Sequence, residues 1–215
     1  MKFAEPSVRE TVLPYAAFAW PFVESILLPA PEPLACGVDR RTTRRFHPPT
    51  MAGVGTLLWH TARCQESIPG PKGLRLEHRP VPSAGALHPI HVLLEVPGRP
   101  CWARYDPHAH ALSVLPDDWP LSQLRTSATR LLDQPASTLL AFVAEPGLTS
   151  AKYFCPESLI WRDAGVLQGA ICMIAPQAGL GACLLGFNGN GAFESLGQQG
   201  QLVGVGTAMV GAPAG

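Results

Sequence analysis

The sequence predicts an α+β fold, and three segments carry that prediction. In residues 157–178 apolar side chains recur every three or four positions, which is the period of a helix with one buried face. Two short apolar runs, HVLLEV (91–96) and STLLAFVAE (137–145), have the length and composition of buried strands. Helical and strand segments are interspersed without a strict β-α-β alternation, so we expect an α+β protein rather than a doubly wound parallel sheet.

The other elements follow along the chain. Residues 1–36 mix helical pieces with prolines and predict an N-terminal arm or outer layer, and residues 37–215 predict the main domain. Pro176 should kink or end the long helix early, and Gly179 suits a left-handed C-terminal cap. The remaining segments are expected as a helix at 50–63 capped by Thr50, a loop at 65–82, a hairpin of 103–106 with 111–115, an amphipathic helix at 121–133, and strands at 181–187 and 201–211.

Composition and charge restrict the classes of partner. Hydrophobic residues make up 47% of the 215 residues and charged residues only 15%, which predicts apolar surface covered by a partner subunit or by a flat ligand. Sixteen Lys and Arg residues balance sixteen Asp and Glu residues, so we expect neither nucleic acid nor a membrane surface as a partner. No targeting segment and no run long enough to span a bilayer is evident, which predicts a cytoplasmic location.

Cysteine and histidine spacing predicts no metal site. The six cysteines are scattered and form no CxxC pair, which argues against a zinc site or a disulfide framework. His88 and His91 could share a helix face, but they have no third ligand nearby in the sequence.

A compact basic cluster, DRRTTRRF, occupies residues 39–46. Arginine suits phosphate because its planar guanidinium can donate two hydrogen bonds at once, and the threonine hydroxyls add further donors. The alternative is an ordinary solvated turn. The two common nucleotide-binding loops, GxxxxGK[ST] and GxGxxG after a strand, are absent, so side chains would have to hold any phosphate.

The segment PSAGALHP, residues 82–89, predicts one wall of a binding site. Ser83 could cap a helix that begins at Ala84, which would leave the first backbone N–H groups directed at a ligand. Gly85 would let a flat ring approach the backbone without meeting a Cβ. An ordinary helix start is the alternative.

These two segments, with KYFCPESLIWRDAG at 152–165 and GLGACLLGF at 179–187, follow one another in the order found in the nitroreductase family. The chain most closely resembles the SagB-type branch, the dehydrogenases that oxidise azolines to azoles, and the resemblance covers residues 37–211. It implies a central, mostly antiparallel sheet surrounded by helices in a domain-swapped homodimer. It also implies two FMN sites at the subunit interface.

The resemblance assigns residues to the flavin site position by position. The residues that would hold the phosphate and ribityl chain are Arg40, Arg41, Thr42 and Arg44. The residues that would line the isoalloxazine from the second subunit are Pro82, Ser83, Ala84, Gly85 and Ala86. The residues that would offer a backbone N–H to the flavin N5 are Leu184, Leu185 and Gly186. No Lys or Arg follows Arg162, so binding of the phosphate would depend mainly on residues 40–44.

The adjacent pair Lys152-Tyr153 occupies the place of the Lys-Tyr pair that is catalytic in the azoline-oxidising branch. Aromatising an azoline transfers a hydride to the flavin and a proton to a base, and Lys152 could take that proton. The Tyr153 hydroxyl could position the ring or relay the proton. The alternative is a surface lysine beside a packing tyrosine, and Asp163 could be a partner for Lys152, a partner for an arginine, or a structural residue of a helix turn.

The leading interpretation is therefore an FMN-dependent oxidoreductase acting on a small-molecule or peptide-derived substrate. A second interpretation is a nitro- or quinone-reductase that uses NAD(P)H as reductant in a ping-pong cycle, with the flavin performing the chemistry. A third is a flavin-binding protein without turnover. Flavin reduction by an azoline substrate alone favours the first, steady NAD(P)H consumption with a quinone or nitroarene favours the second, and no reaction in either assay leaves the third.

Overall fold

The computed structural model describes residues 4–30, 40–119, 121–194 and 201–215. Its main sheet has the strand order β11-β12-β9-β6-β7-β8-β2, with β3 pairing to β12, and every strand pair in it is antiparallel. The strands are β2 (Glu24–Leu27), β3 (Phe46–His47), β6 (Ile90–Glu95), β7 (Trp102–Asp106), β8 (Ala111–Val114), β9 (Thr138–Ala144), β11 (Gly181–Leu184) and β12 (Val203–Pro213).

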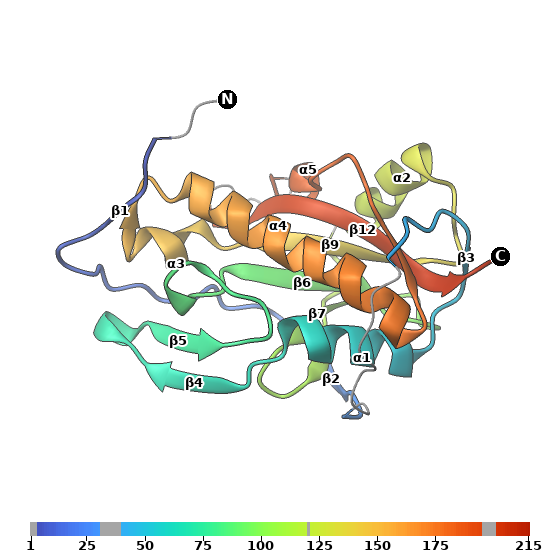
Figure 1. The fold of residues 1–215 in the computed structure, drawn as a ribbon, viewed down its shortest axis with the longest axis horizontal. Helices are drawn as coiled ribbons and strands as arrows, with labels where there is room; N and C mark the ends of the chain where they lie inside the picture. Colours follow the sequence, from blue (N-terminus) through green and yellow to red (C-terminus); the bar gives the residue numbers. More distant parts are fainter. Residues whose placement is uncertain (1–3, 31–39, 120, 195–200) are drawn as a thin grey trace.

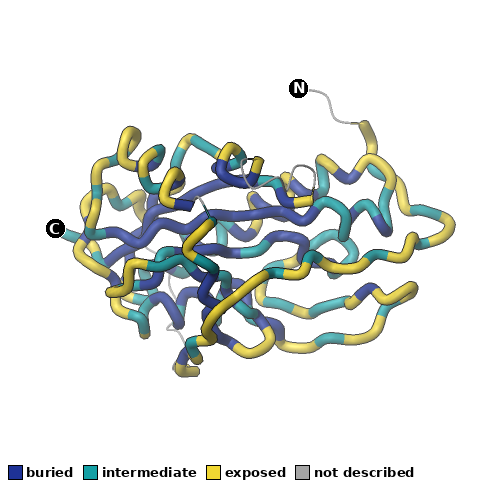
Figure 2. Tube along the Cα trace, turned by 180° about the vertical axis from the view of Figure 1, so that it is seen from behind, coloured by how far each residue is buried: buried dark blue, intermediate teal, exposed yellow. Residues whose placement is uncertain are grey.

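Helices cover both faces of this sheet (Figure 1). On one face α1 (Met51–Ala62) and α4 (Glu157–Ile174) pack against side chains such as Leu140 and Phe142 of β9. On the other face α2 (Ser122–Leu131) and α5 (Asn190–Glu194) pack near the alternate side chains of the same strand, Leu139 and Val143. All seven residues of β9 are buried, because both of its faces are covered, and the buried tubes of Figure 2 run through the middle of the molecule.

The structure confirms the predicted α+β class and most of the predicted elements. The Thr50 side chain accepts a hydrogen bond from the Gly53 N–H and caps α1 as expected. Helix α4 ends at Ile174, where a short 3₁₀ turn carrying Pro176 continues the chain, and Gly179 follows in the left-handed conformation at φ 70°. The proline and the glycine therefore end the helix where the sequence predicted.

Two expectations about secondary structure are wrong. The predicted loop at 65–82 contains a hairpin of β4 (Glu66–Pro69) and β5 (Arg75–His78), which extends beside the main sheet (Figure 1). Within the described residues 4–30 the chain forms strands β1 (Ser7–Val8) and β2 and no helix. Strand β2 pairs with β8 and forms one edge of the main sheet. The pairing satisfies the backbone hydrogen-bonding groups of β2, and so short a sequence does not reveal a partner elsewhere in the chain.

The predicted boundary between residues 36 and 37 lies outside the described residues. Within the described part of the chain, no helix combines the length and the apolar character that crossing a membrane requires.

Candidate active site

The PSAG segment, residues 82–85, is held against α4 by the carboxylate of Asp163. The Ser83 hydroxyl donates to Asp163 Oδ2 at 2.6 Å, and the Ala84 N–H donates to Asp163 Oδ1 at 3.1 Å. Asp163 is buried on α4, so it acts as the structural residue that the sequence analysis considered for this position. The carboxylate therefore sets the position of the whole turn relative to the helix.

The predicted cap at Ser83 needs correction. The helix that follows is only a 3₁₀ turn at Ala84–Ala86, and among the described residues the Ser83 hydroxyl caps no N–H within that turn. It instead accepts from the His88 N–H at 2.9 Å, while the Ala84 N–H points at Asp163 and not outward. A longer helix cannot form because Gly85 and Ala86 have φ values of 64° and 60°.

Lys152 and Tyr153 approach this turn from strand β10 (Tyr153–Phe154) and the residue before it. The Lys152 Nζ donates to the Gly85 carbonyl at 3.2 Å. A Cβ added at Gly85 would lie 2.7 Å from the Tyr153 Oη and 2.8 Å from the Lys152 Nζ. The structure thus brings the predicted catalytic pair and the predicted flavin wall together within one subunit. The two polar side-chain ends, and not a flat ring as expected, occupy the space that the missing Cβ of Gly85 leaves open.

Burial raises the pKa values of Tyr153 and Asp163 in this group. The pKa of Tyr153 is raised by burial and, to a lesser extent, by the nearby Asp163 carboxylate, so the phenol stays protonated at neutral pH and can donate. Burial also raises the pKa of Asp163, and the hydrogen bonds from Ser83 and Ala84 offset part of that effect. The arrangement offers a hydroxyl donor and an amine at one point on the surface of the turn.

The N-terminal strand holds the segment that carries Lys152. Strand β1 pairs with β10, and the Arg9 N–H donates to the Lys152 carbonyl at 3.0 Å. The Arg9 guanidinium lies 3.8 Å from the centre of the Phe154 ring and donates through Nε to the Ser150 carbonyl at 2.7 Å. The sequence does not predict this pairing, because a two-residue strand leaves no periodic signal.

The predicted phosphate-binding residues lie along β11. Thr42 forms an isolated parallel bridge with Ala182, and the Thr43 N–H donates to the Ala182 carbonyl at 3.1 Å. A Cβ at Gly181 would overlap the Thr43 side chain, so the glycine permits this close approach. The predicted side chains are all exposed here, namely Arg40, Arg41, Thr42 and Arg44.

The third predicted segment follows β11 directly. Leu184 is 43% exposed and Gly186 is exposed, whereas the Leu185 N–H donates to the Thr207 carbonyl at 2.9 Å. This segment and Gln168 of α4 border an open depression of about 440 Å³. Because the Leu185 N–H is engaged, Leu184 and Gly186 are the better candidates for an N–H donor.

The residues predicted to form the flavin site fall into two groups at different positions along α4. Asp163 holds the turn that Lys152 and Tyr153 contact. The Arg40 charge instead acts on Cys172, where it offsets part of the rise in the thiol pKa that burial causes. Nine residues of helix at about 1.5 Å each separate Asp163 from Cys172 by about 14 Å. A wider cleft of about 890 Å³ contains none of the predicted residues; among those lining it are Glu95, Trp102, Trp119 and Arg125.

Comparisons with known proteins identify the fold. A scan against protein-family models and a search of curated proteins both find no match. Solved structures do match. One is a protein provisionally named a nitroreductase from Ralstonia eutropha JMP134, with a TM-score of 0.63 and 22% identity over 99% of this chain and 100% of that one.

Two further structures are similar. A chain of the E. coli microcin synthetase McbBCD complex with truncated pro-MccB17 matches with a TM-score of 0.58 and 15% identity, over 86% of this chain and 71% of the other. An oxidoreductase containing FMN matches with a TM-score of 0.50 and 18% identity, over 83% and 75% of the two chains. Together with the antiparallel sheet and its flanking helices, these similarities show that the chain has a nitroreductase-like α+β fold.

Proposed function

We propose that this protein is an FMN-dependent oxidoreductase that oxidises an azoline-type ring in a small-molecule or peptide-derived substrate. The observation that carries the proposal is the convergence of the Lys152 amine and the Tyr153 hydroxyl on Gly85. The fold supports it, since one similar structure contains FMN and another belongs to a complex described as a microcin synthetase.

The residues present fit FMN. Phosphate would find exposed guanidinium and hydroxyl donors, and the Arg40 Nη1 donates to the Thr42 Oγ1 at 3.4 Å, so these two side chains lie next to each other. The isoalloxazine would lie against residues 82–86, and an N–H of Leu184 or Gly186 would reach its N5. When bound, FMN supplies the two-electron acceptor that no amino-acid side chain provides.

The protein's own part in the reaction is acid–base chemistry and positioning. The uncharged form of Lys152 would accept the proton that leaves the ring carbon as the ring becomes aromatic. Tyr153, protonated at neutral pH, donates a hydrogen bond that orients the ring nitrogen or the lysine. Asp163 acts as a positioning residue, because it holds the turn on which both groups converge.

A homodimer would bring the two groups of residues together. Helix α4 exposes large apolar side chains to solvent: Trp161 at 42%, Val166 at 41% and Met173 at 42%. A two-fold axis pairs like surfaces, so two α4 helices packed antiparallel would set the arginine group of one chain beside the Lys152 group of the other. This supports the expected interfacial FMN sites.

The dimer is tested by light scattering of the purified protein. We expect twice the mass of one chain and an interface above roughly 2,000 Å², as permanent dimers have. Val166→Arg should weaken the dimer and FMN binding together. A monomer of the wild-type protein that retains flavin would contradict the shared site.

Flavin binding tests the arginine group. Arg40→Ala and Arg44→Ala should each remove one charge-assisted contact, which costs about 1.5–3 kcal/mol and weakens FMN affinity about ten- to a hundredfold. Arg130→Ala is the matched control, because Arg130 is also exposed but lies in the last turn of α2. Unchanged affinity in both single variants and in the double variant would refute the assignment.

Lys152→Ala distinguishes the proposed dehydrogenase from a general reductase. Loss of a positioned base should lower the rate of azoline oxidation by about 10²–10⁴ while FMN remains bound. In an NAD(P)H-dependent nitro- or quinone-reductase the flavin performs the chemistry, so the same variant should keep its rate. Parental azoline oxidation by a yellow, dimeric Lys152→Ala protein would contradict the catalytic role.

A further inference from the structure

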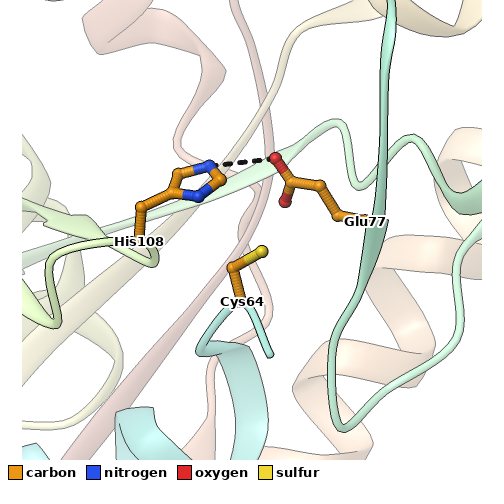
Figure 3. A group of neighbouring side chains, drawn as sticks. All are labelled: Cys64, Glu77 and His108. Atoms are coloured by element: carbon orange, nitrogen blue, oxygen red, sulfur yellow. Dashed lines mark ion pairs between the residues drawn. The ribbon is translucent and has the colours of Figure 1, made fainter. Parts of the chain in front are cut away.

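Three side chains of metal-ligand type meet outside the candidate active site. The Cys64 Sγ, a Glu77 carboxylate oxygen and a His108 ring nitrogen all lie within 4.8 Å of one another. Figure 3 shows the three side chains converging from separate segments of the chain. Cys64 and Glu77 are largely buried, and the His108 side chain is 47% exposed.

The fold fixes these segments to one another by its backbone. The Cys64 N–H donates to the Pro107 carbonyl at 2.9 Å, which ties the residue after α1 to the turn between β7 and β8. In that turn Asp106 accepts from the N–H groups of His108 and Ala109 at 2.9 and 3.1 Å. Backbone hydrogen bonds therefore hold Cys64 and His108 close to each other.

The carboxylate is oriented by its other neighbours. Glu77 Oε1 lies 3.0 Å from the His108 Nε2, while Oε2 accepts from Arg79 at 2.5 Å. Arg79 therefore occupies one oxygen of the Glu77 carboxylate, and the other oxygen pairs with His108.

The geometry suits a four-coordinate divalent ion with one open position. Ligand bonds of about 2.0 Å to nitrogen or oxygen and about 2.3 Å to sulfur put tetrahedral ligand atoms about 3.3–3.6 Å apart. The three ligand atoms lie within 4.8 Å of one another, so the separations must shorten by at most about 1.5 Å to reach these values. The half-exposed His108 side chain has room to make this shift. Thiolate, imidazole and carboxylate together select a borderline-soft metal over Mg²⁺ or Ca²⁺.

We propose that Cys64, Glu77 and His108 bind Zn²⁺, with water or a small anion as the fourth ligand. The Cys64 thiol, which now donates to the Glu66 carbonyl at 3.2 Å, loses its proton to solvent when the Zn–S bond forms. The ion joins the end of α1, the β4–β5 hairpin and the β7–β8 turn. The ion would also help to fix the PSAG turn, because the His88 ring, close to that turn in the sequence, donates to the backbone carbonyl of Glu77 at 3.0 Å.

Cobalt(II) tests this site without any flavin. Co²⁺ added to chelator-treated protein should produce a thiolate-to-cobalt charge-transfer band with one equivalent bound, and Zn²⁺ should displace it. Cys64→Ser should abolish the band and weaken Zn²⁺ binding by at least about tenfold, a loss that even outer-sphere substitutions cause. Cys155→Ser is the matched control, because that cysteine is exposed and directly follows strand β10, away from the three proposed ligands in the sequence; it should keep the band.

A second variant covers a folding failure of Cys64→Ser. His108→Ala replaces a half-exposed turn residue and should also weaken Zn²⁺ binding by at least about tenfold, with unchanged circular dichroism. No charge-transfer band in the wild-type protein, an unchanged band in Cys64→Ser, or unchanged Zn²⁺ affinity in His108→Ala would overturn the proposal.

Discussion

Replacing Gly85 with alanine tests the geometry of the candidate active site most directly. The residue has φ 64°, a conformation that costs an L-residue about 1–2 kcal/mol. The added methyl group would also displace the Lys152 Nζ and the Tyr153 Oη, which lie 2.8 and 2.7 Å from its position. Losing the half-exposed lysine hydrogen bond adds about 1 kcal/mol, so the free energy of unfolding should fall by about 2–3 kcal/mol.

Gly98→Ala is the matched control for this variant. Gly98 has φ 75° and nothing lies within 4 Å of an added Cβ, so only the backbone strain of about 1–2 kcal/mol should appear. Urea unfolding gives the stability of both variants, and azoline oxidation by FMN-loaded protein gives the effect on the displaced pair. Equal losses of stability in the two variants, with oxidation intact in Gly85→Ala, would refute the inferred convergence on Gly85.

Two further predictions concern stability. Burial, with the Arg79 charge, lowers the pKa of His88 to about 4, so the folded protein resists a proton that the unfolded chain binds below about pH 6.5. The free energy of unfolding should therefore fall by up to about 3 kcal/mol as pH falls from about 6.5 through 4. In urea titrations at several pH values, His88→Gln should flatten this dependence, whereas the control His47→Gln, at an exposed histidine, should not. Equal pH dependence in the two variants would contradict the prediction. Thr50→Ala should lower the free energy of unfolding by about 1 kcal/mol through loss of the α1 cap, and a change below about 0.3 kcal/mol would show that the Gly53 N–H finds water instead.

The inner strands of the sheet, such as β6 and β9, were predictable because their sequences carry a strong local signal. Strand β9 is apolar after Thr138, and the structure buries it between two helical layers, as a continuous apolar run indicates. The end of α4 was predictable from Pro176 and Gly179, whose backbone restrictions act whatever surrounds them. The nitroreductase-like order of motifs led to the same fold class that the solved structures display.

The missed features depend on contacts between distant residues. Strand β1 has two residues and exists only through its pairing with β10. The Ser83 cap was wrong because Asp163, eighty residues away in sequence, takes the Ala84 N–H that the cap argument left free. Cys64, Glu77 and His108 follow no spacing motif, so cysteine spacing alone predicted no metal site, and only the folded chain brings the three together.

Helix α4 explains why the candidate site is divided within one chain. Its buried stripe, which includes Ala164, Leu167 and Ile171, fixes the helix on the sheet. The flanks of that stripe carry Asp163, which holds the PSAG turn, and Gln168, which borders the depression beside residues 185–188. The opposite face exposes Val166 and Met173 to solvent. The same helix therefore holds the PSAG turn of its own chain and exposes the surface that the proposed dimer would bury.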